Sequence, residues 1–329
     1  MTSSSANKAR ISVPASSANL GPGFDTLALA LDIRLTAEVE WSDEKVKLHD
    51  FDDPLDWWRD AVEPNTNYGG TLLAFSIEHS GEPNLLATAF VKAILRGGPE
   101  YRLPKLLKAK ITSDIPIAQG LGSSAAATVA GAAIAEIWRK GKADKQAVFE
   151  DAIEIEGHAD NAAAATFGGL QAALALGKAT QATPLKMHED LRVAMAVPEE
   201  TLKENTSATR KWLPEQLKRT EAVSNQRALL TLLYGLKTGQ KQAIAAGFED
   251  RLHVPHRKSV IAGYEDIVAS AVEAGAYGVT ISGAGGAMIA IGTGDMTPVA
   301  SAMKEAYERH GMTARALTPG VDKDGLRVG

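Results

Sequence analysis

The chain has 329 residues, 45% of them hydrophobic and 23% charged, which is enough for two ordinary domains with a large core. Its formal net charge is −5 and no basic block stands out, so a nucleic-acid partner is disfavoured. There is no cysteine, which excludes disulfides, cysteine metal ligands and thiol nucleophiles and favours a cytoplasmic protein. We expect neither a leader peptide nor a membrane partner, because residues 1–10 are polar and no run reaches the roughly 18 apolar residues of a membrane helix.

Apolar periodicity in the first half of the chain predicts a mixture of strands and helices. We expect strands at residues 9–13, 34–41, 106–112 and 170–176, and helices at 84–96, 125–139 and 145–165. Residues 43–83 form a long excursion that no periodic pattern organises. On a single helix over 145–165, Glu150, His158 and Asn161 would share one face.

The composition changes near residues 180–190, where we place a soft boundary between two domains, residues 8–185 and 186–329. Beyond it we expect strands at residues 191–197, 278–281 and 287–291, helices at 206–214, 215–239 and 240–251, a helix from the turn at 253–257 to Gly275, and a helix at 298–310. Strands and helices are mixed in both predicted domains.

A loop crowded with turn-forming residues follows the first predicted strand, and we name its core, Ser17–Asp25 (SANLGPGFD), the first signature. It contains Asn19 and Asp25, residue types whose side chains commonly bond to their own backbone in Asx-turns. The alternative is that both groups form a polar wall that orients a small zwitterionic or hydroxylated ligand. The loop by itself leaves both interpretations open.

The second signature, Gly120–Ala125 (GLGSSA), follows Pro116 and opens a long apolar helix. Glycines allow the backbone to approach a ligand closely, and the free N–H groups of a helix N-terminus attract anions, so we favour a phosphate cradle. A Walker A loop is excluded because no Gly-Lys-Ser/Thr follows. Two alternatives stay open: a helix cap that binds nothing, and a Gly-x-Gly-x-x-Ala dinucleotide fingerprint, which Pro116 and the helical segment downstream disfavour.

The third signature, Ser282–Gly286 (SGAGG), completes a set of glycine-rich or polar motifs in a fixed order. Together the three resemble the superfamily of galactokinase, homoserine, mevalonate and phosphomevalonate kinases over roughly residues 10–292. The first signature and the run Glu156–Asn161 (EGHADN) resemble the homoserine kinases in particular. The sequence departs from that pattern around Ala159–Ala164 and at Gly285–Gly286.

This resemblance implies a two-domain small-molecule kinase fold, with an N-terminal ATP-binding domain like domain 2 of ribosomal protein S5 and a ferredoxin-like C-terminal α+β domain. It implies that ATP and Mg²⁺ are used to phosphorylate the hydroxyl of L-homoserine in threonine biosynthesis. It leaves a homodimer open.

The resemblance also implies which residues form the site. The substrate-binding set would be Asn19, Asp25, His158, Asn161, Thr206, Arg210 and Arg257. The nucleotide-binding set would be Asn84, Pro116, Gly120, Leu121, Gly122, Ser123, Ser124 and Ala125. Ser124 and Glu150 would hold Mg²⁺.

The residue types suit this chemistry. Ser124 and Glu150 offer the hard oxygen atoms that Mg²⁺ prefers, arginine guanidinium groups match a carboxylate, and Asp25 can pair with an ammonium group. No residue stands out as a general base for phosphoryl transfer. The alternatives that remain are a sister kinase of the mevalonate type, an NAD(P)-dependent oxidoreductase that uses the second signature, and a homologue that binds its ligand without catalysis.

Overall fold

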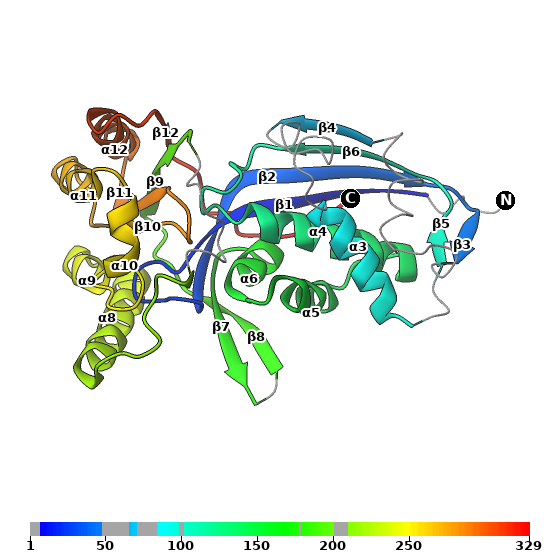
Figure 1. Ribbon diagram of the computed structural model, residues 1–329, viewed down its shortest axis with the longest axis horizontal. Coiled ribbons are helices and arrows are strands. Elements are labelled where there is room, and N and C mark those ends of the chain that lie inside the picture. Colours follow the sequence, from blue (N-terminus) through cyan, green and yellow to red (C-terminus); the bar gives the residue numbers. More distant parts are fainter. Residues whose placement is uncertain (1–6, 48–65, 71–83, 99–101, 178, 201–209) are drawn as a thin grey trace.

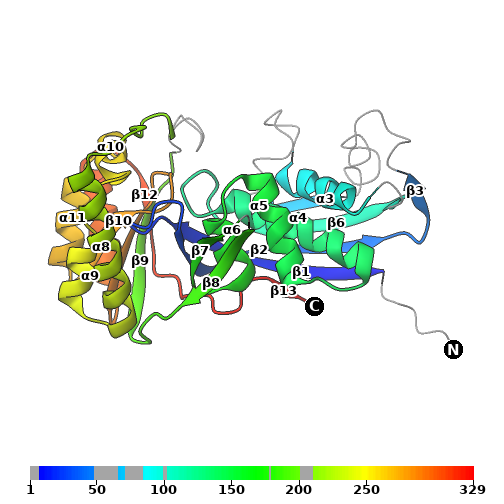
Figure 2. The ribbon, with the colours of Figure 1, turned by 90° about the horizontal axis from the view of Figure 1, so that it is seen from below.

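The computed structural model describes residues 7–47, 66–70, 84–98, 102–177, 179–200 and 210–329. The molecule is elongated, with a long sheet at one end and a second sheet wrapped by helices at the other (Figure 1). Seen from below, the helices of residues 219–273 stack at the end opposite the strand Lys45–Lys47 (Figure 2). Within the described residues, no helix combines the length and apolar character that crossing a membrane requires.

The first sheet is built around two long antiparallel strands that the sequence predicted only in part. Its members are β1 (Lys8–Ala18), β2 (Leu27–Trp41), β4 (Thr66–Gly70), β6 (Leu107–Ser113), β7 (Leu170–Leu176), β8 (Ala179–Leu185) and β13 (Arg327–Val328). The order is β13-β1-β2-β6-β4, with β7 paired to the other end of β2 and to β8. Only β4, which lies beside β6, is parallel to its partner among these pairs. A separate ladder joins β3 (Lys45–Lys47) to β5 (Arg102–Pro104).

Burial along these strands explains why their cores were predictable and their ends were not. In β6 the side chains alternate strictly between buried and exposed, as expected for a sheet with one solvated face. The prediction ended the first strand at Val13 because Pro14 cannot donate a ladder hydrogen bond. In the structure β1 continues to Ala18, and its register with β2 shifts between Pro14 and Ala15, so an irregularity in the ladder accommodates the proline.

Four helices in this half are α3 (Leu85–Arg96), α4 (Ser123–Lys140), α5 (Lys145–Glu156) and α6 (Asp160–Phe167). The central helix α4 is buried at every position from Ala125 to Ile137. A Cβ on Gly131 would lie 2.2 Å from the carbonyl oxygen of Leu86, so α3 crosses α4 at this glycine. The prediction of one helix over 145–165 is wrong: α5 ends at Glu156, and Gly157 turns the chain with a φ of +76°.

The second sheet has the order β10-β11-β9-β12, and all of its strands except the edge strand β12 are buried along most of their length. Its strands are β9 (Leu191–Pro198), β10 (Gly278–Ile281), β11 (Met288–Thr293) and β12 (Ala314–Leu317). Its helices are α8 (Arg219–Thr238), α9 (Lys241–Gly247), α10 (Val254–Arg257), α11 (Tyr264–Glu273) and α12 (Thr297–Arg309). Val193 and Met195 of β9 share a core with α8, whereas Ala194 and Ala196 pack with α11 and α12. Residues 206–209 of the predicted helix over 206–214 lie outside the described part, and residues 210–214 form a turn and not a named helix.

The last ten residues return to the first sheet. Arg34 of β2 forms an ion pair with the buried carboxylate of Asp322 and donates hydrogen bonds to the carbonyls of Ser12 (2.8 Å) and Gly325 (2.7 Å). β13 then pairs with β1. The predicted boundary at 185/186 lies between β8 of the first sheet and β9 of the second, but residues 320–329 belong with the first sheet.

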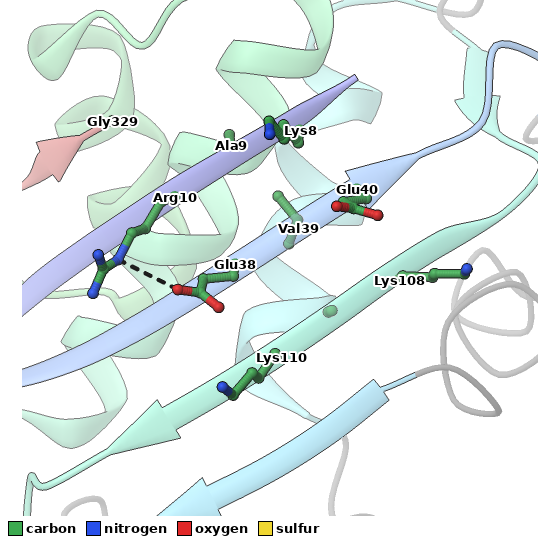
Figure 3. A pocket seen from close by; sticks show the side chains of 10 residues that line it. Lys8, Ala9, Arg10, Glu38, Val39, Glu40, Lys108, Lys110 and Gly329 are labelled. Carbon is green, nitrogen blue, oxygen red and sulfur yellow. Dashed lines mark ion pairs between the residues drawn. The ribbon is translucent and has the colours of Figure 1, made fainter. Parts of the chain in front are cut away.

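The solvated face of the first sheet carries a hollow of about 550 Å³ across β1, β2 and β6 (Figure 3). Strand register sets charges of alternating sign side by side in two rows, Lys8–Glu40–Lys108 and Arg10–Glu38–Lys110. This end of β1 is roughly 30 Å from Ala18 at about 3.3 Å per residue. The hollow therefore lies far from the three signatures, and we do not place the site there.

Candidate active site

The three signatures meet where the two sheets adjoin. The N–H of Gly283 donates to the carbonyl of Ala18 at 3.1 Å, which joins the third signature to the first. The hydroxyl of Ser282 donates to the carbonyl of Gly120 at 2.7 Å and can accept from the hydroxyl of Ser17, which lies 2.9 Å away. The N–H of Ser16 donates to the carbonyl of Leu121 at 3.0 Å. Segments far apart in sequence thus form one cluster of backbone loops.

Glycine is required in this cluster because the loops touch backbone to backbone. A Cβ on Gly120 would lie 2.0 Å from the carbonyl oxygen of Ser282, and one on Gly285 would lie 2.1 Å from the carbonyl carbon of Gln119. A Cβ on Gly122 would lie 2.1 Å from Ser16 Oγ, and the φ of Gly122 is +68°. The glycine pattern that predicted a ligand loop therefore also serves the packing of the loops on each other.

The second signature ends in an N-terminus that is open to an anion. Gly122 is the N-cap of α4 and offers no side chain to the first amides of the helix, Ser123 to Ala125. These N–H groups and the helix dipole favour a negatively charged ligand. The dinucleotide alternative is wrong, because residues 114–119 separate β6 from the glycines and another helix follows α4.

The carboxylate at this helix end is Glu156, which corrects the prediction of Glu150. One oxygen of Glu156 accepts hydrogen bonds from Ser124 Oγ at 2.7 Å and from Thr128 Oγ1 at 2.6 Å. Glu150 is exposed on α5 and accepts a hydrogen bond from Gln146 at 3.0 Å. The resemblance selects Glu150 by its spacing of eleven residues before Asn161. In the structure α5 ends at Glu156, and the side chain of this last residue turns toward α4.

The turn after α5 and the start of α6 add polar groups beside Glu156. His158 lies between two carboxylates, with Nε2 3.9 Å from Glu156 and Nδ1 3.7 Å from Asp160. Burial raises the pKa of Asp160, and the nearby Asp25 raises it further. Asn161 accepts a hydrogen bond from Ser16 Oγ at 2.8 Å, which ties α6 to the strand that precedes the first signature.

The first signature presents Asp25 at the edge of this cluster. Asn19 Oδ1 accepts a hydrogen bond from the N–H of Asp25 at 3.0 Å, and Asn19 Nδ2 donates to the carbonyl of Gly283 at 2.8 Å. Asn19, Leu20 and Asp25 have φ values of 71°, 45° and 52°, a left-handed conformation that costs energy and that surrounding contacts must hold. Asn19 therefore bonds to backbone groups, one of them within its own loop, and holds Asp25 in place.

Two arginines from the second half of the chain converge on Phe24. Arg210 pairs with Asp25, and the guanidinium carbons of Arg210 and Arg257 lie 5.6 Å and 5.4 Å from the centre of the Phe24 ring. Arg257 is almost fully buried, and its Nη1 donates to the carbonyl of Gly283 at 3.1 Å. Burial and the neighbouring Arg210 lower the pKa of Arg257 to about 10, so it remains charged at neutral pH. Its Nε has no hydrogen-bond partner among the described residues.

Three of the predicted nucleotide residues also contribute to packing or to a helix cap. Leu121 is buried in the core, so only its backbone can face a ligand, and Pro116 is also buried. Asn84 caps α3, with its side-chain oxygen accepting from the N–H groups of Leu86 and Ala87. Thr206 lies outside the described residues.

Sequence reasoning missed the residues that support the site from behind: Ser16, Thr128, Phe24, His253 and Ser282. Two signals were available, one for Glu156, which sequence reasoning also missed, and one for Thr128. Gly157 in a helical pattern is a typical C-terminal cap and could have ended α5 at Glu156. Ser124 and Thr128 are four residues apart and therefore share a helix face.

Comparisons with known proteins agree with this geometry. Models of the GHMP kinases N terminal domain and of the GHMP kinases C terminal match residues 86–169 and 233–309. The homoserine kinase of Parasynechococcus marenigrum is 36% identical over 314 residues, covering 94% of this chain and 92% of that protein. The homoserine kinase of Nostoc punctiforme is 33% identical over 323 residues, covering 96% and 97%.

A solved structure extends the similarity to the whole fold. The crystal structure of homoserine kinase from Cytophaga hutchinsonii matches with a TM-score of 0.82 at 24% identity, covering all of this chain and 99% of that one. Sequence identity above 30% over nearly the full length of both chains, two matching family models and the meeting of the three signatures all lead to one assignment. The chain belongs to the GHMP kinases and, within them, to the homoserine kinase family.

Proposed function

We propose that this ATP-dependent kinase phosphorylates the side-chain hydroxyl of L-homoserine to give O-phospho-L-homoserine, a step of threonine biosynthesis. The observation that carries the proposal is the arrangement of charged groups at one junction. Asp25, Arg210 and Arg257 surround Phe24 on one side. The helix N-terminus with Ser124 and Glu156 belongs to the same set of connected loops.

The charged side suits the two ends of an amino acid. In this proposal Arg257 and Arg210 bind the substrate carboxylate and Asp25 binds its ammonium group. The unpartnered Nε of Arg257 supports this role, because a buried guanidinium N–H gains most from an anionic acceptor. Asn161 and His158 line the path between this charged side and α4, and Asn19 holds Asp25 in place.

The helix N-terminus suits the phosphates of ATP. The amides of the second signature would hold the phosphates, and Ser124 with Glu156 would hold Mg²⁺. The donor set fits a hard cation, since it combines a carboxylate with hydroxyl oxygens. An anionic Glu156 beside a phosphate site would repel the phosphates unless a cation neutralised it. When bound, Mg²⁺ offsets charge on the transferred phosphoryl group.

The remaining chemistry is positioning. Phosphoryl transfer needs the hydroxyl in line with the γ-phosphate more than it needs a strong base. We propose that the hydroxyl loses its proton to the transferred phosphoryl group as the new bond forms. A substrate of the mevalonate type fits less well, because it has no ammonium group to replace Arg210 beside Asp25.

A coupled assay of ADP release tests the proposal with L-homoserine, L-serine, L-threonine, 4-hydroxybutyrate and mevalonate as acceptors. We expect the highest kcat/KM with L-homoserine and no turnover without Mg²⁺. A higher kcat/KM with mevalonate would overturn the substrate and leave the kinase. If none of these acceptors supports ADP release, while ATP still raises the melting temperature of the protein, the whole proposed substrate class is overturned.

A further inference from the structure

His253 is fully buried in the second half of the chain, and none of the binding roles proposed above uses it. It immediately precedes α10, whose last residue is Arg257. Its ring reaches back to the first signature, where Nε2 lies 2.9 Å from the carbonyl oxygen of Gly21. The ring also lies against Phe24, with 5.4 Å between ring centres.

The two ring nitrogens face partners of opposite kind, and this fixes where the proton sits. Nδ1 lies 3.3 Å from Nη1 of Arg257, and a guanidinium group can only donate. Nδ1 must therefore accept. The carbonyl of Gly21 can only accept, so Nε2 must carry the hydrogen. One neutral tautomer, with its hydrogen on Nε2, satisfies both contacts.

The backbone around the ring is held independently of the ring. Asp250 accepts hydrogen bonds from the N–H of Leu252 (3.0 Å), His253 (2.7 Å) and Val254 (2.6 Å). This cap fixes the start of α10. The ring nitrogens are therefore free to serve Gly21 and Arg257, and Asp250 Oδ2 lies 3.9 Å from Nε2, beyond hydrogen-bond distance.

We propose that neutral His253 is a positioning residue for Arg257: its Nδ1 holds Nη1, so that the Nε side of the guanidinium stays available to the substrate carboxylate. Arg257 has two acceptors on Nη1, Gly283 and His253, and a buried Nε with no partner among the described residues. Losing the His253 acceptor lets the guanidinium rotate toward other acceptors. This inference rests on the proposed function insofar as it assigns a carboxylate to Arg257.

Burial agrees with a neutral ring. It lowers the pKa of His253 to about 4; the nearby Arg257 lowers it too, whereas Asp250, Asp25 and the bond to Gly21 raise it. A proton added to Nδ1 would face the Arg257 guanidinium with no acceptor between them. The geometry and the electrostatics thus favour the same protonation state at neutral pH.

Two matched variants separate positioning from packing. In His253→Asn the amide oxygen can take the place of Nδ1, which keeps the acceptor for Arg257. In His253→Gln the amide lies near the place of Nε2, which keeps the Gly21 contact and loses that acceptor. We expect His253→Gln to raise the KM for L-homoserine about tenfold, His253→Asn to raise it less than threefold, and neither to change the KM for ATP.

An equal rise in the homoserine KM for both variants, or a parallel rise in the ATP KM, would show a merely structural role and overturn the proposal. Nitrogen-15 NMR of the wild-type imidazoles, with His253 assigned by its loss in His253→Asn, tests the tautomer without any substrate. We expect a protonated Nε2 and an unprotonated Nδ1 from pH 8 to pH 5.5. A protonated Nδ1 would overturn the positioning role even if homoserine is the substrate. If the expected tautomer is found but the wild-type enzyme does not phosphorylate homoserine, the proposed substrate is wrong and the His253–Arg257 arrangement stands.

Discussion

Arg210 donates two hydrogen bonds of 2.8 Å, one to each carboxylate oxygen of Asp25. The two residues proposed to bind opposite ends of the substrate are thus bound to each other. A zwitterion presents the same two charges and can replace each partner with its equivalent. A ligand with only a carboxylate would occupy Arg210 and leave Asp25 without a cation, so the pair favours amino acids over hydroxy acids.

Asp25→Asn tests this discrimination. The variant weakens the grip on an ammonium group but keeps a side chain of the same shape, so we expect the homoserine KM to rise about tenfold. That figure is modest because both side chains are about 40% exposed and solvent screens the pair. The KM for 4-hydroxybutyrate should change little or fall. Equal losses for both substrates in the ADP-release assay would remove Asp25 from ammonium recognition.

Glu156→Gln and Glu150→Gln form a matched pair on one helix. We expect Glu156→Gln to lower kcat by on the order of 10²-fold at saturating Mg²⁺, since a charged ligand is lost where charge develops. Glu150→Gln should leave kcat near the wild-type value, because Glu150 is exposed and bonds only to Gln146 among the described residues. The opposite ranking would restore the original prediction of Glu150. Circular dichroism checks that both variants stay folded.

Gly122→Ala and Gly141→Ala compare the two ends of α4. Both glycines have left-handed φ values, +68° and +73°, so the backbone strain of an added Cβ is similar. Only at Gly122 would the Cβ meet a neighbour, Ser16 Oγ at 2.1 Å, while nothing lies within 4 Å at Gly141. Isothermal titration should therefore show ATP affinity at least tenfold weaker for Gly122→Ala and unchanged for Gly141→Ala. Unchanged affinity in both would leave the helix end as a cap without a phosphate.

The pH dependence of stability should report the buried imidazole. The pKa of His253 is lowered to about 4 in the folded protein, against about 6.5 when unfolded, so the unfolded chain binds more protons between these values. Its contribution is fully present above pH 6.5 and is lost as pH falls toward 4, on the order of 3 kcal/mol at most. Buried carboxylates act in the opposite sense: burial raises the pKa of Asp151 to about 6. Urea unfolding of the wild type and of His253→Asn at pH 6.5 and near pH 4 isolates the contribution of the imidazole. Equal losses of unfolding free energy in the two proteins would contradict this contribution.

The sequence predicted much of the fold because alternation and helical periodicity survive wherever one face is buried, as in β6 and α3. It failed where a single residue decides. Pro14 suggested a strand end, but an irregular register absorbs it. Gly157 ends α5 within an unbroken periodic pattern, so the single helix predicted over 145–165 is in fact two helices. β12 and β13 were not predicted, because short strands at sheet edges depend on partners distant in sequence.

Sequence reasoning likewise singled out some residues of the candidate site and missed others. The resemblance singled out Asn19, Asp25 and Arg257, and the structure brings these three residues together around Phe24 and Gly283. Sequence reasoning could not find Phe24 or His253 as supports, because their roles exist only through contacts between the two halves of the chain. Propensity contains no information about which buried histidine accepts a hydrogen bond from which arginine.

The return of residues 320–329 to the first sheet has a consequence for biosynthesis. Arg34 leaves the ribosome almost three hundred residues before its carboxylate partner Asp322, which follows 288 positions later. Until then β1 in the nascent first half has an unpaired edge, and Arg34 lacks the carboxylate that pairs with it in the folded protein. We therefore expect this half not to settle as an independent unit before residues 320–329 have been synthesised and have paired with it.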